Sequence, residues 1–510
     1  MARRSKSSFL TRLPLFLLVW GIASLSMYVP AIYAVVQNNH PASRSFFYAG
    51  TLGLIFMTMV ALARASHKSR HGTLGQLLAL LGTFALLPVF LAVPVHDAIG
   101  TTSFLNAYFD MVSAITTTGA NLFDDPARLA PSLHLWRAEV AWLGGLLMWV
   151  AASAILAPLS LGGFEVTARG QPGRSVAALM QMQQADPRKR LVRITATLAP
   201  VYAGLTLALW LLLMMAGETA LTGVIHAMSV MATSGISPVG GIGQSQAGVP
   251  GEMILFLFMF FALSRLTFSH DTATTGFGRL DKDPEFRIGL MLVFGVPVLL
   301  FLRHWWSAFD VNATEGTMLA LRAFWGAMFT VMSFLTTTGF ESGDWEEARQ
   351  WSGLGTPGLI LMGLALIGGG VATTAGGVKL LRVYALYLNG VREMEQLVHP
   401  SSVSGAGAGN RRIQKNGAFI AWVFFMLFAL SLALITVVLA ALGSSFDQAL
   451  VLSVATLSTT GPLIGIAAET PIHLAEMSGW AKGVLCVAMV LGRLETLAII
   501  ALLTPNLWRN

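Results

Sequence analysis

Long apolar stretches alternate with short polar connections along the whole chain. Ten of these stretches contain about 20 residues, the length that crosses the apolar core of a bilayer as a helix. They cover residues 15–36, 46–64, 75–96, 134–158, 191–216, 252–269, 286–303, 357–386, 417–442 and 479–503. The first exceeds the apolar part of a secretory signal, about 7–15 residues, so we expect it to remain as a span. The pattern predicts an all-α polytopic membrane protein.

Four shorter apolar segments lie between the spans, near residues 103–116, 219–232, 319–336 and 446–458. At about 12–18 residues each, they favour re-entrant or interfacial helices over full spans. All four end in a small polar loop with a glycine: "SAITTTGA" (113–120), "SVMATSGI" (229–236), "SFLTTTGF" (333–340) and "ATLSTTGP" (455–462). Two full spans separate successive loops, so the loops face the same side of the membrane. The alternative is four unrelated helix caps.

This periodicity divides the chain into two additional N-terminal transmembrane helices, residues 1–70, and four parallel units of span, short helix, loop and span. The units are residues 71–165, 186–272, 284–395 and 413–510, with loops near 116–120, 232–236, 336–340 and 458–462. We expect the four units to surround a central pore on a pseudo-fourfold axis along the membrane normal. The stretch "SSVSGAGAGN" (401–410) is typical of a flexible linker.

Composition agrees with a membrane protein and indicates its orientation. Of the 510 residues, 55% are hydrophobic and 11% charged, whereas soluble domains carry about 25% charge. The net charge of +7 reflects lysine and arginine in alternate connections, which favours both termini on the cytoplasmic side and argues against nucleic-acid binding. Acidic residues gather on the opposite side, where they either attract cations to an outer mouth or simply solvate the loops.

The four loops are candidates for binding a dehydrated cation. Non-helical backbone at membrane depth must be buried in protein or line a water-filled path. Glycine allows unusual backbone angles, and a ring of carbonyl oxygens can replace the hydration shell of a monovalent cation. The expected carbonyl donors precede the glycines Gly119, Gly235, Gly339 and Gly461; they are Thr117, Thr118, Thr233, Ser234, Thr337, Thr338, Thr459 and Thr460.

A second candidate feature is the glycine-rich interior of one apolar stretch, "LIGGGVATTAGGVKLLRVYAL" (366–386). Each glycine costs a helix about 1 kcal/mol relative to alanine, so the pattern favours a helix broken over residues 366–379. The break contains Gly368, Gly369, Gly370, Thr373, Thr374, Gly376, Gly377 and Lys379. It would either obstruct the pore beneath the loops, as a gate, or reflect close packing of helices through small residues.

The third candidate is Arg493, deep in the last apolar stretch. An unpaired arginine at that depth is costly and should face the bundle interior or water. It either places a fixed positive charge beside the pore or belongs to a structural ion pair.

Other classes of protein fit the chain less well. The single cysteine, Cys486, and the scattered histidines provide no thiol cluster, nucleophile or metal site, so we expect neither an enzyme nor an organic cofactor. The main alternative is a sodium- or proton-coupled secondary transporter of cations or small solutes. Such folds usually have inverted repeats and paired broken helices, which this chain lacks.

Together the four loops, the segment "GGGVATTAGGVK", the stretch "DKDPEFR" (281–287), the ending "GRLETLAIIALLTPNLW" and the two N-terminal spans resemble the TrkH/KtrB family of potassium transporters. The resemblance covers essentially the whole chain and is greater to TrkH than to the eight-span KtrB. It implies potassium uptake across the bacterial cytoplasmic (inner) membrane by a homodimer with one pore per subunit. It also implies a cytosolic, TrkA-like nucleotide-binding regulatory partner.

The same resemblance assigns roles to residues. The family's filter glycines fall on Gly119, Gly235, Gly339 and Gly461, its intramembrane gating loop on residues 368–377, and its pore arginine on Arg493. Two loops depart from the family pattern. Ser234 stands where a first glycine is often found, and the fourth loop reads Ser-Thr-Thr-Gly-Pro where Asn-Cys-Gly-Pro is common.

Overall fold

The computed structural model describes residues 13–64, 73–157, 163, 187–264, 283–307, 317–353, 355–399, 415–468 and 470–495. Within these residues all regular structure is helical, which confirms the predicted fold class. The linker predicted at 401–410, the ends of the spans predicted at 252–269 and 479–503, and many basic residues of the connections lie outside the described residues.

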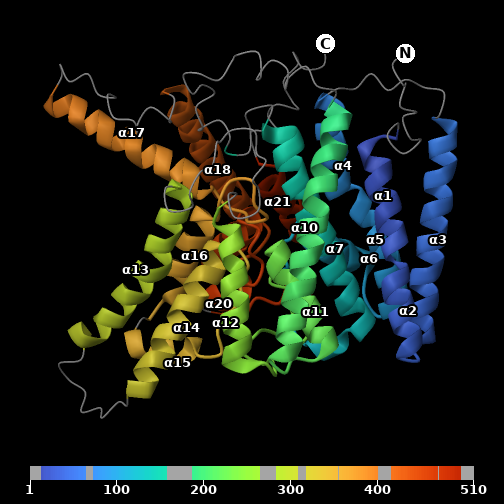
Figure 1. Cartoon of the computed structure of the whole chain (residues 1–510), viewed down its shortest axis with the longest axis horizontal. Coiled ribbons are helices and arrows are strands. Elements are labelled where there is room, and N and C mark those ends of the chain that lie inside the picture. The colour runs from blue at the N-terminus through green and yellow to red at the C-terminus, as the bar shows by residue number, and fades with distance from the viewer. Residues whose placement is uncertain are drawn as a thin grey trace.

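The N-terminal part forms two adjacent candidate spans at one edge of the molecule (blue in Figure 1). Helices α1 (Leu15–Ser26) and α2 (Tyr28–Val36) make the first, and α3 (His40–Ala63) makes the second. A short interruption at Met27 separates α1 from α2. Pro30, in the first turn of α2, has no N–H to continue the ladder of α1, so the sequence favours a new helix there.

The remaining helices follow in chain order. Next come α4 (Thr73–Ala85), α5 (Leu87–Ile99), α6 (Phe104–Ile115), η2 (Pro126–Arg128), α7 (Pro131–Ala151) and its π-helical extension η3 (Ala152–Leu156). They are followed by α10 (Pro187–Met215), α11 (Ala220–Ala232), α12 (Gly248–Met259) and η4 (Phe260–Ala262). The next group is α13 (Pro284–Ser307), α14 (Thr317–Leu335), α15 (Trp345–Ser352), α16 (Pro357–Ile367) and α17 (Leu380–Val398). The last is α18 (Lys415–Ala441), α19 (Phe446–Leu457), α20 (Leu463–Ala467), η9 (Leu474–Glu476) and α21 (Gly479–Leu494).

Eight helices of the described residues are long and apolar enough to cross a membrane. The chain is therefore a multi-pass membrane protein. One of the eight is α14, with 19 residues, which covers the apolar segment predicted at 319–336 and is long enough to span. Helix α14 packs against both α13 and α15, and it is longer than α6, α11 and α19, which have 12 or 13 residues.

Three of the four helices that precede the loops begin with the same kind of side-chain N-cap. Ser103, Thr219 and Ser445 occupy the N-cap positions of α6, α11 and α19, and each side-chain oxygen accepts a hydrogen bond from the N–H three residues later. Such caps satisfy one of the free N–H groups at a helix start and contribute about 1 kcal/mol. Each short helix therefore has a defined beginning in an otherwise apolar sequence.

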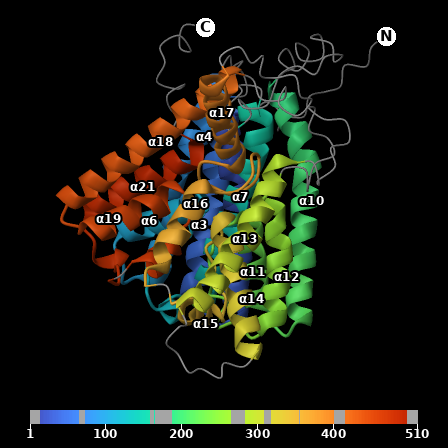
Figure 2. The same cartoon turned by 90° about the vertical axis from the view of Figure 1, so that its left-hand side faces the viewer.

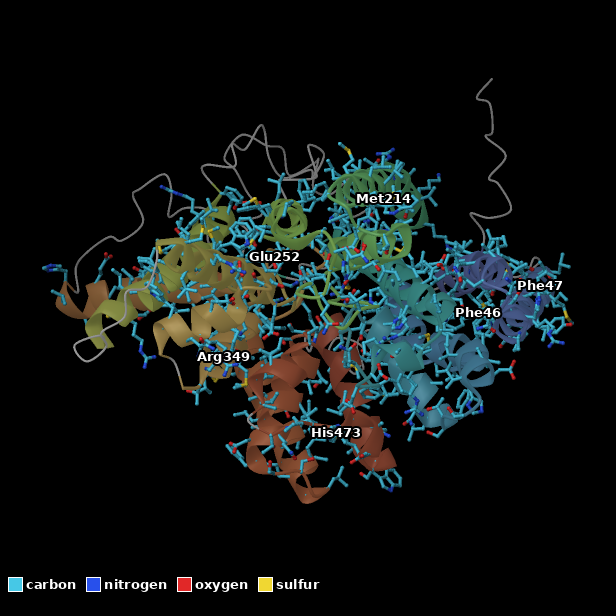
Figure 3. The ribbon with its side chains drawn as sticks, turned by 90° about the horizontal axis from the view of Figure 1, so that it is seen from below. Phe46, Phe47, Met214, Glu252, Arg349 and His473 are labelled. Atoms are coloured by element: carbon cyan, nitrogen blue, oxygen red, sulfur yellow. The ribbon has the colours of Figure 1, made fainter. Side chains whose placement is uncertain are left out.

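The helices are arranged around a common centre. Helix α6 packs against α5, α7 and α21, α11 against α7 and α10, α14 against α13 and α16, and α19 against α18 and α21. The contact between α6 and α21 joins the first unit to the last. Seen from below in Figure 3, the teal, green, yellow and red groups surround one centre, with the blue N-terminal helices outside them. In the side view of Figure 2, α15 lies at the lower end and α17 at the upper end.

Candidate functional site

Each helix that precedes a loop ends in a turn centred on a threonine. Thr117, Thr233, Thr337 and Thr459 have φ values of 56°, 54°, 58° and 54°, in the left-handed region that β-branched residues rarely adopt. The next residue of each loop donates its N–H back to a helix carbonyl at 2.8–2.9 Å. Gly119, Gly235 and Gly339 also have positive φ, 66°, 64° and 84°, as we expected of glycine, and the threonines adopt such angles in all four loops.

The four glycines are needed because the loops approach one another closely. A Cβ added to Gly119 would lie 1.6 Å from the carbonyl oxygen of Ser234. A Cβ on Gly235 would lie 2.3 Å from the carbonyl oxygen of Thr338. Neither distance can be accommodated without moving backbone. The first loop therefore touches the second, and the second touches the third.

The fourth loop completes these contacts. A Cβ on Gly339 would lie 3.0 Å from the ring of Pro462, and one on Gly461 would lie 2.6 Å from the carbonyl oxygen of Thr118. Gly461, unlike the other three glycines, lies outside the left-handed region, and its N–H donates to the Thr118 carbonyl at 2.6 Å. The loops thus meet in the order first, second, third, fourth, first, and form a closed ring whose residues are buried. Pro462 of the fourth loop also approaches the second loop, since a Cβ on Gly235 would lie 2.5 Å from its ring.

The segment between α16 and α17, residues 368–379, is non-helical and buried. Its Gly376 N–H donates to the hydroxyl of Thr337 at 2.7 Å, and a Cβ on Gly376 would lie 2.1 Å from the carbonyl oxygen of Ser458. The hydroxyl of Thr374 donates to the carbonyl of Met231 at 3.1 Å. The segment therefore lies against the ends of α11, α14 and α19, at the end of the ring where the loops begin.

Backbone contacts from other elements hold this segment in place. The Gly370 N–H donates to the carbonyl of Ala262 at 2.9 Å. The Val371 N–H donates to the Glu285 carboxylate at 2.8 Å. Segment 368–379 is therefore bound to the helix pair α12–η4 and to the start of α13, in addition to the ring.

Arg493 contacts the same segment. Its Nη1 donates to the carbonyl oxygen of Thr374 at 2.7 Å, and its side chain is 3% exposed. Within the part of the chain that the structure describes, its Nε and Nη2 have no hydrogen-bond partner and no acidic residue pairs with it. A buried, unpaired guanidinium thus lies beside the segment that meets the ring.

An ion pair that sequence reasoning missed joins the segment's far end to α21. Arg382, in the first turn of α17, donates to Glu495 at 2.6 Å, and both side chains are buried. The Arg382 guanidinium also lies 3.7 Å from the ring centroid of Phe424. The sequence shows only that each of the two charged residues lies in an apolar stretch. They are 113 positions apart, so no local pattern could predict that they pair.

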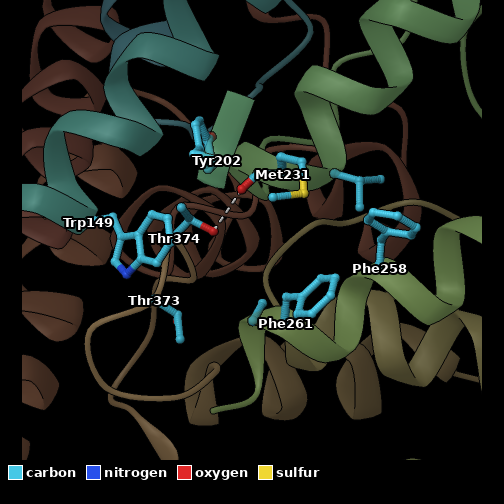
Figure 4. A pocket seen from close by; sticks show the side chains of 9 residues that line it. Trp149, Tyr202, Met231, Phe258, Phe261, Thr373 and Thr374 are labelled. Carbon is cyan, nitrogen blue, oxygen red and sulfur yellow. Dashed lines mark hydrogen bonds between the residues drawn. The ribbon is translucent and has the colours of Figure 1, made fainter. Parts of the chain in front are cut away.

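A small cavity of about 20 Å³ adjoins segment 368–379, room for about one water molecule. Figure 4 shows Thr373 and Thr374 on one side of it, with Trp149, Tyr202 and Phe261 around them. Across the cavity, the two threonines face aromatic side chains from three other helices.

At the other end of the ring, several acidic residues have structural partners. Glu218 accepts hydrogen bonds from the Thr219 N–H and the Ser245 hydroxyl, and Asp344 pairs with Arg322 at 2.7 Å. The hydrogen bonds and the ion pair of these two residues show that they stabilise the loops. Glu341 differs: burial raises its pKa to about 7, although nearby Arg349 opposes the shift.

Glu252 is a further residue that sequence reasoning missed. This buried carboxylate, at the start of α12, accepts hydrogen bonds from Trp325 at 2.9 Å, the Ser342 hydroxyl at 2.7 Å and the Gly343 N–H at 2.6 Å. It thereby fixes the chain that leaves the third loop. The sequence shows only that this acidic residue lies in an apolar stretch, which marks it as unusual but does not predict its partners.

Buried, non-helical loops that meet in a ring inside a helix bundle are the arrangement expected of a membrane transport protein, because backbone at membrane depth must be buried in protein or line a water-filled path. The profile of TrkH, described as a cation transport protein, matches residues 253–509. The chain belongs to this TrkH family.

Individual relatives match over nearly the whole chain. The Trk system potassium uptake protein TrkH of Vibrio parahaemolyticus is 30% identical over 511 residues, 97% of this chain and 98% of the relative. That of Escherichia coli is 29% identical over 496 residues, covering 95% and 96%. The crystal structure of the potassium transporter TrkH from Vibrio parahaemolyticus matches with a TM-score of 0.79 at 26% identity, covering 98% of this chain and all of that one.

Proposed function

We propose that this protein takes up potassium ions across the bacterial cytoplasmic membrane through the ring of four loops. The observation that carries the proposal is the closed order of contacts between Gly119, Gly235, Gly339, Gly461 and the neighbouring loop in each case. Relatives that match over the full length are named as potassium uptake proteins. A ring of backbone oxygens suits a monovalent cation that has lost its water.

In this proposal the ion ligands are carbonyl oxygens at the start of each loop. They belong to Thr117, Thr118, Thr233, Ser234, Thr337, Thr338, Thr459 and Thr460. The carbonyl ends of α6, α11, α14 and α19 lead into these residues, and their partial negative charge favours a cation. The Thr118 carbonyl would share its oxygen between the Gly461 N–H and the ion, which its two lone pairs allow.

Segment 368–379 would act as the gate of this pore. Its contacts with Thr337, Ser458 and Met231 support a position across the ion path, because those residues belong to three different quarters of the ring. Gly368, Gly369, Gly370, Gly376 and Gly377 would let the backbone move, and Thr373, Thr374 and Lys379 would set its closed position. Arg493 would hold that position through Thr374 and add a positive charge that limits cation residence.

The resemblance also suggests the wider assembly. We expect a homodimer with one pore per subunit, both termini on the cytoplasmic side, and control by a cytosolic TrkA-like nucleotide-binding subunit. Alternate connections rich in arginine and lysine support this orientation. Potassium is the cargo, and the chain's own residues suggest no organic cofactor.

Uptake of isotopes of potassium, rubidium and sodium by proteoliposomes that contain the purified chain tests the proposal. Potassium and rubidium should enter faster than sodium, and empty vesicles should take up neither. The counterpart experiment offers organic solutes under a sodium or proton gradient. Saturable solute uptake without cation permeation would refute the pore and favour a coupled transporter.

A further inference from the structure

The four loops of the ring are not all held by the same hydrogen bonds. In the first loop the Ala120 N–H donates to the hydroxyl of Ser113 at 2.7 Å. In the third loop the Phe340 N–H donates to the hydroxyl of Ser333 at 2.6 Å. Ser113 and Ser333 occupy the same place, two residues before their helices end. Each hydroxyl therefore binds the amide directly after a ring glycine.

The rest of these two loops is also the same. The hydroxyls of Thr116 and Thr118 lie 2.8 Å apart, and those of Thr336 and Thr338 lie 3.0 Å apart. The N–H groups of Gly119 and Gly339 donate to the carbonyls of the same two serines, both at 3.2 Å. Three consecutive amides thus turn back onto one serine in each loop.

Within the described residues, the second and fourth loops lack the contact between a serine hydroxyl and the amide after the glycine, although the hydroxyls of Ser458 and Thr460 in the fourth loop lie 3.2 Å apart and so pair as in the first and third. In the second loop the hydroxyl of Ser229 lies 3.2 Å from that of Ser234, because Ala232 replaces the threonine that would pair with residue 234. In the fourth loop Ala455 replaces the serine, and Pro462 has no N–H to donate. The Gly461 N–H bonds instead across to the first loop.

The order of contacts around the ring places the matching loops opposite each other. The first loop touches the second and fourth, and the third does the same. The serine-held loops thus face each other across the centre, and the other two loops alternate with them. The four loops are similar in sequence, but the contact between a serine hydroxyl and the amide after the glycine occurs in two opposite loops.

The serine contact determines the direction of one peptide group. In a trans peptide the N–H of a residue and the preceding C=O point in opposite directions. The Ala120 N–H points back to Ser113 in α6, so the Gly119 carbonyl points away from α6. The same geometry at Ser333 directs the Gly339 carbonyl.

We infer that Ser113 and Ser333 are positioning residues that fix the peptide group after the ring glycine in two opposite loops, and with it the adjoining proposed ligand carbonyls of Thr118 and Thr338, and thereby set the ring's preference among monovalent cations. This inference rests on the proposed pore function. Neither serine touches the ion, because both hydroxyls are committed to backbone amides. Without the hydroxyl, a buried N–H loses its acceptor and the glycine peptide is free to rotate.

Fluxes of potassium and sodium in proteoliposomes test the inference with Ser113→Ala, Ser333→Ala and their combination. Each single substitution should lower the potassium-to-sodium flux ratio roughly five- to tenfold, the factor associated with loss of one buried hydrogen bond. Ser333→Thr keeps the hydroxyl and should restore the ratio. Ser229→Ala is the matched control, since its hydroxyl binds no amide, and should change the ratio less than about twofold.

The outcomes separate this inference from the proposed function. A wild-type protein without cation flux or potassium preference would refute the pore itself. A selective wild type with unchanged ratios in the Ser113 and Ser333 variants, or an equal loss in Ser229→Ala, would refute the positioning role alone. Ser333→Cys, with a weak acceptor of similar size, serves if the alanine variant does not insert. If Ser113→Ala, Ser333→Ala and Ser333→Cys all fail to insert into the membrane, the serines act in folding and the inference is overturned.

Discussion

The hydroxyl of Thr337 accepts a hydrogen bond from the backbone N–H of Gly376 at 2.7 Å. Thr337 belongs to the third loop of the ring, and Gly376 belongs to the proposed gate. The equivalent hydroxyls of Thr117 and Thr459 have no partner within the described residues. Of the hydroxyls of Thr117, Thr337 and Thr459, that of Thr337 is the one that binds segment 368–379, whose own Thr374 hydroxyl bonds to Met231 of the second unit.

Replacing Thr337 with valine should increase cation permeation in the resting state. Valine keeps the shape of the side chain but cannot accept the Gly376 N–H, so the closed position loses about 1 kcal/mol, roughly a fivefold change in the open fraction. Single-channel recording or isotope efflux measures it. Thr117→Val alters the same ring position without a gate contact. Equal permeation in the two variants would exclude the contact as a gate restraint.

Arg493 could limit conduction through its hydrogen bond to Thr374 or through its positive charge, and a lysine variant distinguishes the two. Arg493→Ala removes both the hydrogen bond to Thr374 and the buried charge, so resting conductance should rise by about tenfold or more, the range for a charged hydrogen bond. Arg493→Lys keeps the charge but cannot reproduce the guanidinium geometry. If the bond matters, lysine should resemble alanine. If the charge alone limits conduction, lysine should resemble the wild type, and identical conductance in all three proteins would leave arginine with no role in gating.

A methyl group at Gly119 should abolish selective transport. The added Cβ would lie 1.6 Å from the Ser234 carbonyl oxygen, so the first two loops must separate, and we expect the potassium-to-sodium ratio to approach one. Gly204→Ala provides the control, because Gly204 lies in α10 and has no atom within 4 Å of an added Cβ. Alanine there should leave transport intact and favour the helix by up to about 1 kcal/mol. Normal selectivity in Gly119→Ala would contradict the ring contact.

Local patterns in the sequence predicted those parts of the structure that local physics determines. Apolar length predicted seven of the eight candidate spans in the described residues, and the glycine density of residues 366–379 pointed to the segment that the structure leaves non-helical between Ile367 and Leu380. The order of the loops around the ring, the Arg382–Glu495 pair and the contacts of Glu252 were not predictable. They join residues far apart in the chain, and no periodicity encodes which distant partner a buried polar group meets.

Breaking the Arg382–Glu495 pair should destabilise the protein strongly. Glu495→Gln leaves the Arg382 guanidinium buried opposite a neutral group, and removal of one partner of a buried pair typically costs about 3–5 kcal/mol. Replacing both residues with apolar side chains should cost less, because no charge is left alone. The unfolding temperature of the detergent-solubilised protein measures the difference. A double variant no more stable than Glu495→Gln would contradict a simple pairwise role.

Glu341 should make uptake depend on external pH near neutrality. Burial raises the pKa of its carboxyl to about 7, so the group is ionised at about pH 8 and protonated at about pH 6, whereas an ordinary carboxyl would remain ionised at both. Lowering the pH over this range removes one negative charge beside the ring and should raise the apparent KM for potassium about twofold at low salt, the size expected for one charge roughly 10 Å away in water. Glu341→Gln should show the higher KM at both pH values. Glu347→Gln removes a charge from α15 and should keep the pH dependence. If the pH dependence disappears in Glu347→Gln, or persists in Glu341→Gln, the titrating group is not Glu341.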